Sequence, residues 1–184
     1  KDNLGNIYEG DWLNDMKTGS GTYEDVNGDT YVGDWVNDFR HGRGKITYSN
    51  GDNYEGDWVD DVKEGQGVEI FIADGVTYSG QFKSGLFHGS GEYKSKIGDL
   101  YNGNWSSGKQ DGQGIYKSSI GDKYEGSWKN GMKHGKGKYE FVDGSIYNGE
   151  WENDNINGDG KYTFSDGSIC TCLLYTSPSP RDSR

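Results

Sequence analysis

Tyr124–Ile146 reads YEGSWKNGMKHGKGKYEFVDGSI, and variants of this stretch recur along the chain. The fullest copies begin Tyr-x-Gly-x-Trp, pass a polar segment, continue Gly-x-Gly-x-Tyr and end at an Asp-Gly pair. Their leading tyrosines are 23 residues apart, with one step of 24, and are Tyr8, Tyr31, Tyr54, Tyr78, Tyr101, Tyr124 and Tyr147. A fixed period in this range indicates a repeat array rather than a single globular core.

The period predicts seven repeats, at residues 8–30, 31–53, 54–77, 78–100, 101–123, 124–146 and 147–169. Gly5 precedes Tyr8 by three residues, as Gly28 precedes Tyr31. We therefore expect residues 1–7 to be the tail of a truncated preceding repeat, so that the chain is a fragment. The extra residue of the third repeat falls in Val68–Asp74, where we expect a bulge or a longer connection.

The composition is too polar for an ordinary two-layer core. Of the 184 residues, 30% are hydrophobic, and the formal net charge is −11. However, 14% are aromatic and recur in register, and each ring can bury about 150–250 Å². We therefore expect a folded array in which each repeat covers the aromatic face of its neighbour.

Within each repeat, aromatic residues and glycines alternate with polar residues, as in β-strands. Tyr8, Gly10 and Trp12 alternate with acidic residues, then a turn-rich segment leads to Gly19-x-Gly21-x-Tyr23. A period of two places the rings and glycines on one face of a β-hairpin. We interpret the glycines as leaving room for rings from adjacent strands to lie flat.

The combined pattern closely resembles the MORN repeat (membrane occupation and recognition nexus), most fully at residues 124–146 and over nearly all of residues 4–169. The resemblance implies an all-β fold: an elongated, twisted and curved single-layer antiparallel sheet of consecutive β-hairpins, with no helices in the array. It also implies a scaffold or docking function. Phe82 replaces tryptophan in the fourth repeat, which is a departure from the pattern.

Residues from 170 onward break the period. Cys170 stands where a tyrosine is due, and Cys172–Asp182 reads CLLYTSPSPRD, which resembles a translated sequencing adapter. We predict that residues 170–184 are a non-native, disordered tail. The other residues include 17 basic and 29 acidic side chains, a net charge of −12.

The net charge and the cysteine content limit the classes of partner and the cellular compartment that we expect. A strongly acidic chain argues against nucleic acid, because phosphate neutralisation supplies most non-specific affinity. No apolar run is long enough for a membrane-spanning helix, and there is no signal peptide. The two cysteines form no disulfide framework, so we expect a cytoplasmic location, with membrane or cytoskeleton association as a further option.

Apparent catalytic and ligand motifs are better explained by turns. His41, His88 and His134 recur two repeats apart, about 19 Å, too far to share one metal ion. Gly103–Gln110 resembles a phosphate loop but lacks the hydroxyl residue after lysine. Asp25–Asp29 resembles a calcium loop whose twelfth residue is not glutamate. We therefore predict no catalytic residues, no cofactor and no metal, and no enzyme activity in this segment.

Two sets of residues are candidates for partner binding. The first is the aromatic face, which we expect either to be the core or to form a groove for an extended peptide, an amphipathic helix or a second copy; its rings are Tyr8, Trp12, Tyr31, Trp35, Tyr54, Trp58, Tyr78, Phe82, Tyr101, Trp105, Tyr124, Trp128, Tyr147 and Trp151. The second is a set of basic residues five positions after the tryptophans, which we expect to form a ladder along the turn edge: Lys17, Arg40, Lys63 and Lys133.

These sets support three hypotheses. The leading hypothesis is a non-enzymatic scaffold that binds a protein partner, or itself, through the aromatic–glycine groove. The first alternative is a peripheral membrane module whose basic edge binds phosphoinositides. The second alternative is the targeting or regulatory segment of a larger enzyme, such as a phosphatidylinositol phosphate kinase, as the resemblance implies.

Overall fold

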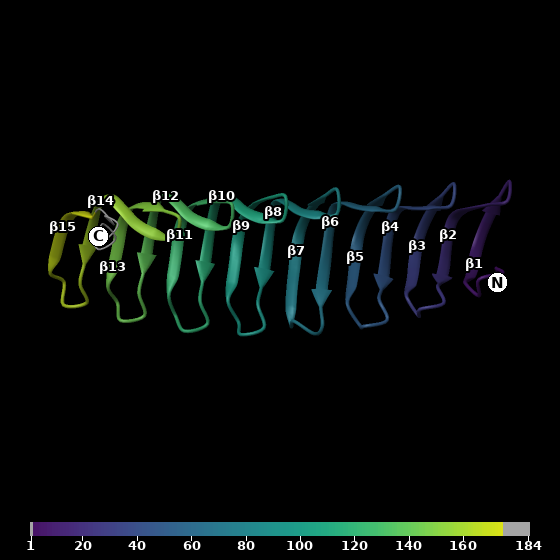
Figure 1. Cartoon of the computed structure of the whole chain (residues 1–184), viewed down its shortest axis with the longest axis horizontal. Coiled ribbons are helices and arrows are strands. Elements are labelled where there is room, and N and C mark those ends of the chain that lie inside the picture. The colour runs from purple at the N-terminus through teal and green to yellow at the C-terminus, as the bar shows by residue number, and fades with distance from the viewer. Residues whose placement is uncertain (1, 175–184) are drawn as a thin grey trace, which may run out of the picture. The chain divides into compact units, whose positions relative to one another are not determined.

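The computed structural model describes residues 2–174, and the chain divides into two compact units, residues 1–96 and 97–184. In each unit the strands follow chain order and pair antiparallel (Figure 1). The described residues contain no helix. The predicted fold class, an all-β single-layer sheet of consecutive hairpins, is confirmed.

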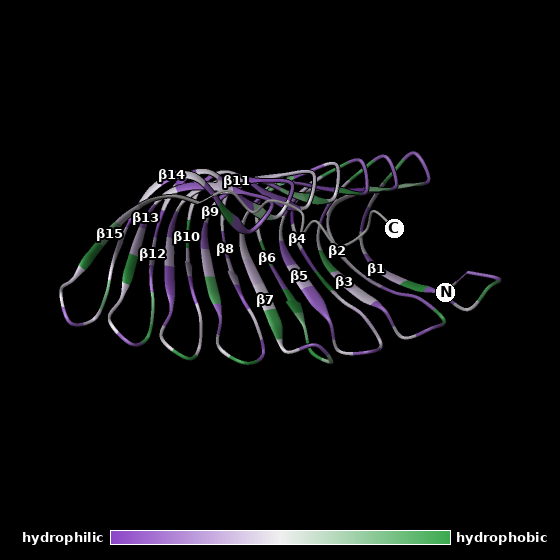
Figure 2. Ribbon diagram, turned by 60° about the vertical axis from the view of Figure 1, so that its left-hand side comes forward, coloured by the Kyte–Doolittle hydropathy of each residue, from purple (hydrophilic) through white to green (hydrophobic). Residues whose placement is uncertain are grey.

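The first unit holds four hairpins. Their strands are β1 (Ile7–Leu13), β2 (Met16–Glu24), β3 (Thr30–Val36), β4 (Phe39–Thr47), β5 (Asn53–Val59), β6 (Val62–Phe71), β7 (Val76–Lys83) and β8 (Leu86–Lys94). Polar and apolar residues occur within the same strand (Figure 2), as expected of a sheet whose two faces differ.

The second unit holds three hairpins and a further strand. Its strands are β9 (Leu100–Ser106), β10 (Lys109–Lys117), β11 (Lys123–Lys129), β12 (Met132–Glu140), β13 (Ile146–Glu152), β14 (Asn155–Thr163) and β15 (Ile169–Leu174). β15 pairs with β14 from Thr163↔Ile169 to Gly158↔Leu174. The structure thus places residues 170–174 in a strand where we expected disorder. Residues 175–184 of the predicted tail lie outside the described residues.

Every hairpin turns through two residues with positive φ. In the first hairpin, Asn14 and Asp15 have φ of 52° and 63°. This is the sign pattern of a type I′ turn, which suits the twist of paired strands and favours Asn, Asp and Gly. The sequence supplies these residues in most turns, and the equivalent pairs are Asn37–Asp38, Asp60–Asp61, Ser84–Gly85, Ser107–Gly108, Asn130–Gly131 and Asn153–Asp154.

A bulge interrupts each hairpin at the first glycine of Gly-x-Gly. In the first hairpin Gly10 pairs with Gly21 but Asp11 pairs with Thr18, so Gly19 falls within the bulge. Gly19 has φ of 60°, a conformation that costs glycine little. Gly19 is therefore required by the backbone conformation of the bulge. This corrects the interpretation that it makes room for the rings.

Gly21, the second glycine of the motif, and its partner Gly10 both lie beneath the leading tyrosine, Tyr8. Gly10 pairs with Gly21, and a Cβ at Gly10 would lie 2.5 Å from the Tyr8 hydroxyl and 2.6 Å from the Gly21 Cα. The ring therefore lies against bare backbone, and any side chain would displace it. The predicted role of these two glycines is confirmed.

The extra residue of the third repeat lengthens the strands. The pairing of β6 with β7 continues to Phe71↔Val76 without a register shift, and only Ile72–Gly75 connects the two strands. In the first repeat the ladder stops at Glu24↔Thr30. The expected bulge or longer connection is therefore wrong: one added ladder pair and a shorter connection together account for the 24-residue step.

A methyl group at a paired glycine should destabilise the array. In Gly56→Ala, the new Cβ would meet the Gly67 Cα and the Tyr54 hydroxyl, both at 2.5 Å. We expect a loss of about 1–3 kcal/mol in the free energy of unfolding, measured by urea denaturation followed by circular dichroism. The control is Glu55→Ala, an exposed neighbour. Equal stability of the two variants would contradict the role given to the glycine pair.

The buried tyrosines should make the fold sensitive to alkali. Burial raises the pKa of Tyr78 and of Tyr124 to about 12 from an ordinary value of 10.0. A folded-state pKa above the unfolded one stabilises the fold fully below pH 10, and this contribution is lost as the pH rises towards 12.

We therefore expect the phenolate absorbance of these tyrosines to appear together with the loss of sheet circular dichroism, above pH 10. The chain unfolded in urea serves as the reference and should titrate near pH 10. Ionisation of all tyrosines near pH 10 with the sheet intact would contradict their burial.

Candidate functional site

The candidate site lies on the face that carries the rings. Twelve of the fourteen predicted groove rings are buried, with exposed fractions from 0% for Tyr54 to 8% for Trp128. The exceptions lie on β1: Trp12 is 56% exposed and Tyr8 is half-buried. The buried rings form the core, so little of their surface remains for a partner.

The rings interlock from one repeat to the next. The Tyr8 ring lies edge-on between Trp12 of its own repeat and Trp35 of the next, with centroid distances of 5.1 and 5.4 Å. The Trp35 indole N–H donates to the Gly21 carbonyl at 3.3 Å, and the Tyr31 hydroxyl donates to the Asp34 carbonyl at 3.1 Å. Both polar ends of the buried rings are therefore satisfied by backbone.

The four predicted basic residues lie on this same face. Because the turns have only two residues, Lys17 is already in β2, directly opposite Trp12. The structure thus corrects their predicted position on the turn edge: they lie over the rings, at the ninth position after each leading tyrosine, which we call the cation position. The other three are Arg40, Lys63 and Lys133.

Lys17 shows the arrangement most fully. Its ammonium lies 4.7 Å from the Tyr23 ring centroid, 4.8 Å from Trp35 and 5.7 Å from Tyr8. The ring faces carry partial negative charge and attract the cation. The Asp38 carboxylate accepts a hydrogen bond from the Lys17 backbone N–H at 2.9 Å, so the next repeat fixes the position of Lys17 from its turn.

The side chains of the other three basic residues pair with carboxylates, whereas only the backbone of Lys17 does so. Arg40 lies 4.4 Å from the Trp58 ring and its Nε donates to Asp61 at 2.7 Å. Lys133 lies over three rings, with its Nζ 3.7 Å from Asp154. In contrast, no carboxylate oxygen of the described residues lies within ion-pair distance of the Lys17 ammonium.

A second row of side chains lies beside the rings, at the fifteenth position after each leading tyrosine. Tyr23 faces Tyr8 across the first hairpin, and Ile46 faces Tyr31 across the second. In the third repeat this second-row position holds Glu69, which is 7% exposed and pairs with Lys63. The Gly-x-Gly-x-Tyr pattern reveals this row, since its tyrosine recurs with the repeat period, but the row was not among the predicted binding residues.

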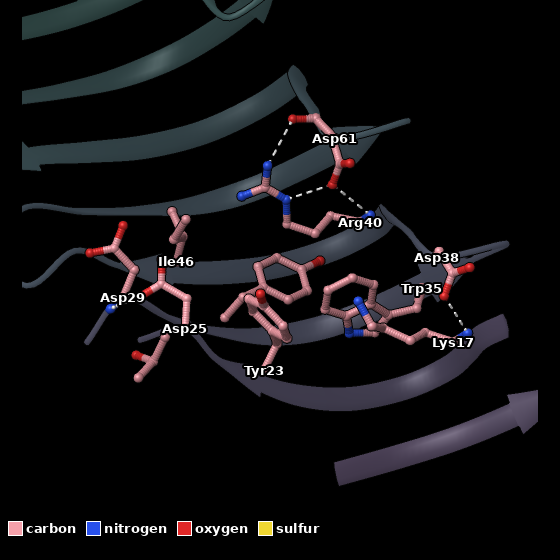
Figure 3. Close-up of a pocket in the computed structure, with 11 residues that line it drawn as sticks. Lys17, Tyr23, Asp25, Asp29, Trp35, Asp38, Arg40, Ile46 and Asp61 are labelled. Atoms are coloured by element: carbon pink, nitrogen blue, oxygen red, sulfur yellow. Dashed lines mark hydrogen bonds and ion pairs between the residues drawn. The ribbon is translucent and has the colours of Figure 1, made fainter. Parts of the chain in front are cut away.

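A cleft of about 280 Å³ opens on this face across β2 to β5 (Figure 3). Lys17 and Arg40 lie in it beside the rings, with the Tyr23 ring between them and the loop carboxylates. Its lining comprises Lys17, Tyr23, Asp25, Asp29, Thr30, Tyr31, Trp35, Asp38, Arg40, Ile46 and Asp61. The cleft thus combines partly accessible aromatic surface with charges of both signs.

The loop carboxylates of the cleft are engaged in turns. Asp25 accepts hydrogen bonds from the backbone N–H groups of Asn27 and Asp29 at 2.8 and 3.0 Å. Although desolvation opposes the change, these hydrogen bonds lower the pKa of Asp25 below its usual value. Asp29 in turn accepts from the Ser49 N–H at 2.9 Å, which links consecutive repeats. The calcium-like segment is thus built as a turn.

Residues of the phosphate-loop-like segment and of the histidine set also have structural roles in the sheet and its turns. Gly103 lies beneath the Tyr101 ring, and Gly108 forms the hairpin turn. His41 Nδ1 lies 3.3 Å from Asp60. Among residues 2–174, no cluster of three or more histidine, cysteine or acidic side chains could hold a metal ion.

Comparison with known families identifies the repeat. The family model described as MORN repeat matches residues 8–30, 31–53, 54–73, 78–100, 101–123, 124–146 and 147–169. The third match stops at residue 73, close to the position of the extra residue. None of the curated proteins compared with the chain matches it, and none of its described segments is a helix that could cross a bilayer.

Solved structures share the fold at low sequence identity. The TCP domain of SAS-4 (dCPAP) from Drosophila melanogaster, in complex with a proline-rich motif of Ana2 (dSTIL), is 12% identical over 93% of this chain and 92% of that chain, with a TM-score of 0.54. The G-box domain of the microcephaly protein CPAP is 16% identical, over 94% of this chain and 100% of that chain, with a TM-score of 0.48. The first of these likenesses shows a shared fold.

The stability of the fold should tolerate joint replacement of the Lys63–Glu69 ion pair, but not the loss of one of its two partners alone. Lys63→Ala leaves the Glu69 carboxylate buried without its partner and should cost about 3–5 kcal/mol. The double variant Lys63→Met/Glu69→Tyr replaces the pair by packed side chains and should be neutral or up to about 4 kcal/mol more stable than the native chain.

The measurement is the free energy of unfolding in urea. Lys45→Ala is the matched control, since its pair with Glu55 is exposed and worth about 0–1 kcal/mol. A double variant as unstable as Lys63→Ala would show that the pair itself is required.

Proposed function

The chain belongs to the MORN-repeat family, and from this premise we propose that it is a non-enzymatic scaffold that binds a protein partner along its aromatic face. The observation that carries the proposal is the cleft over β2 to β5, where half-buried Tyr23 and Lys17 border a hollow of about 280 Å³. Concave surfaces that combine aromatic and convergent polar groups are the usual place for ligands.

An extended peptide fits this surface better than a globular partner does. The core rings and Ile46 are covered, so a ligand would contact Lys17, Arg40 and Tyr23, of which the first two occupy the same position in consecutive repeats. The TCP domain of SAS-4, which shares the fold, is recorded in complex with a proline-rich motif. This supports a peptide ligand for the present chain.

The phosphoinositide hypothesis is less favoured by the contacts. Arg40, Lys63 and Lys133 each pair with a carboxylate, and a headgroup would have to displace it. The net charge of −11 also opposes attraction to an anionic surface. Membership of a larger enzyme, and location in the cytoplasm or on the cytoskeleton, stay predictions.

An unbiased peptide library displayed against the folded chain tests the proposal. We expect enriched peptides whose affinity, measured by fluorescence anisotropy, falls about tenfold or more in Lys17→Ser and in Tyr23→Leu. The control is Lys45→Ser, which removes a lysine from the other face of the same sheet. Circular dichroism should show that all three variants are folded.

Two outcomes would overturn the proposal. One is a library that yields no binder, or binders insensitive to Lys17 and Tyr23. The other is salt-sensitive sedimentation with phosphoinositide vesicles that is lost when Lys17, Arg40, Lys63 and Lys133 are changed to serine, which would make membrane binding the function instead.

A further inference from the structure

A side-chain hydrogen bond links consecutive repeats in the second unit. The Tyr116 hydroxyl donates to Asp99 Oδ2 at 2.9 Å, and the Tyr139 hydroxyl donates to Asp122 Oδ2 at 3.0 Å. In both pairs the tyrosine is the second-row residue of one repeat, and the aspartate directly follows the loop glycine of the repeat before it. We call the aspartate at this position the loop aspartate. It is the acceptor for the second-row tyrosine of the next repeat.

The first two repeats keep the acceptor of this bond and lack the donor. Asp29 is the loop aspartate of the first repeat, but the second-row residue of the second repeat is Ile46. Asp29 Oδ1 accepts from the Ser49 N–H at 2.9 Å, and the loop aspartates of the second unit accept the equivalent N–H groups at 2.8 and 2.9 Å. The same backbone contact thus orients all three carboxylates. Within residues 2–174, however, no group donates to Asp29 Oδ2.

The missing tyrosine also leaves space. Asp29 and Ile46 both line the cleft of about 280 Å³, at the end away from Lys17 (Figure 3). Ile46 is only 6% exposed, so it forms the covered floor of this end and offers a ligand little surface. Asp29 and Tyr23 are partly exposed. The accessible groups are therefore a carboxylate oxygen and one side of an aromatic ring.

A phenol matches these groups better than a charged side chain does. A cavity of about 150 Å³ can hold benzene, so the cleft has room for one ring, which can pack against Tyr23. The phenol hydroxyl supplies the donor that Asp29 lacks, and hydrogen bonds to a carboxylate are among the stronger ones. A ligand carboxylate would meet Asp25 and Asp29 at this end. A ligand cation would share the cleft with Lys17 and Arg40.

We propose that the peptide ligand of this face inserts a tyrosine side chain above Ile46, packs its ring against Tyr23 and donates from its hydroxyl to Asp29 Oδ2. The ligand thereby supplies the contact that Tyr116 and Tyr139 make within the array. This inference rests on the proposed function, because it names a side chain that the ligand of the same cleft contributes.

Two capped amino acids that differ only in the hydroxyl test the inference. N-acetyltyrosine amide and N-acetylphenylalanine amide are titrated into the isotope-labelled chain, and the backbone N–H signal of Ser49, which donates to Asp29, is followed. We expect the tyrosine derivative to bind about tenfold more tightly or better, because the phenylalanine derivative cannot make the hydrogen bond to the charged acceptor.

Two variants locate the hydroxyl. Asp29→Asn keeps an oxygen for the Ser49 N–H but replaces the second acceptor by an amide, so the preference for tyrosine should disappear. Ile46→Tyr restores the tyrosine found in most repeats and fills the cleft, so neither compound should bind. The matched control is Asp52→Asn, which should keep the preference, because Asp52 Oδ2 already accepts from Asn50 at 2.8 Å. Circular dichroism should show that all three variants are folded.

Three results would overturn the inference. The first is equal binding of the two compounds, or a preference that survives Asp29→Asn. The second is a Ser49 signal that does not respond to the tyrosine derivative. The third is tighter binding of Nα-acetyllysine amide than of the tyrosine derivative, which would assign this end of the cleft to a basic side chain.

The display experiment separates this failure from failure of the proposed function. Library peptides that need Lys17 and Tyr23 but bind Asp29→Asn as tightly as the native chain would uphold the scaffold and reject the tyrosine contact. If the chain captures no library peptide but binds the tyrosine derivative through Asp29, the contact stands and the scaffold proposal fails.

Discussion

The contact between each leading tyrosine and a pair of glycines is the constraint on which the other features depend. Tyr54 lies against Gly56 and Gly67 with no room for a Cβ at either position. Because the ring lies flat on the backbone, the core is one ring thick, and a single sheet can bury it without a second layer. The tryptophan of the next repeat closes the side of the tyrosine, as Trp58 does for Tyr31 at a centroid distance of 5.5 Å. Burial thus depends on the neighbouring repeat, as in other repeat arrays.

This arrangement separates the positions that hold the fold from those that vary. The glycine pair, the tyrosine and the aromatic four residues after it have buried roles in nearly every repeat. The cation position holds Lys17, Arg40, Lys63 and Lys133, but also Phe87, Gln110 and Ile156 in the remaining repeats. Phe87 stacks on Tyr78 at 3.7 Å, so an apolar ring replaces the cation over the same surface. The fold therefore accepts different chemistry at this position.

Much of the fold could be predicted from the sequence, because its determinants recur with one period. Alternation around Tyr8 and Trp12 predicts hairpins, and the glycines predict close packing of the rings. The position of Lys17 could not be read in the same way, because it depends on turn length. Asn14–Met16 is compatible with a longer turn, and only the positive φ of both Asn14 and Asp15 shows that the strand resumes at Met16. The predicted basic edge and the predicted aromatic groove are consequently one surface.

The third repeat shows how the residues beside the core can change while the core itself stays the same. Its second-row residue is Glu69 in place of an aromatic or aliphatic side chain, and Lys63 compensates the charge from the cation position of the same repeat. The cation position and the second-row position thus carry opposite charges in this repeat, while Tyr54, Trp58 and the glycine pair keep their buried places. A pair of this kind contributes little to stability compared with packed apolar side chains. Its effect on the surface is larger, because a satisfied ion pair stands where most repeats have a half-buried tyrosine ring. In an array whose core is fixed by the repeat, the chemistry of this row can therefore change from aromatic to ionic within a single repeat.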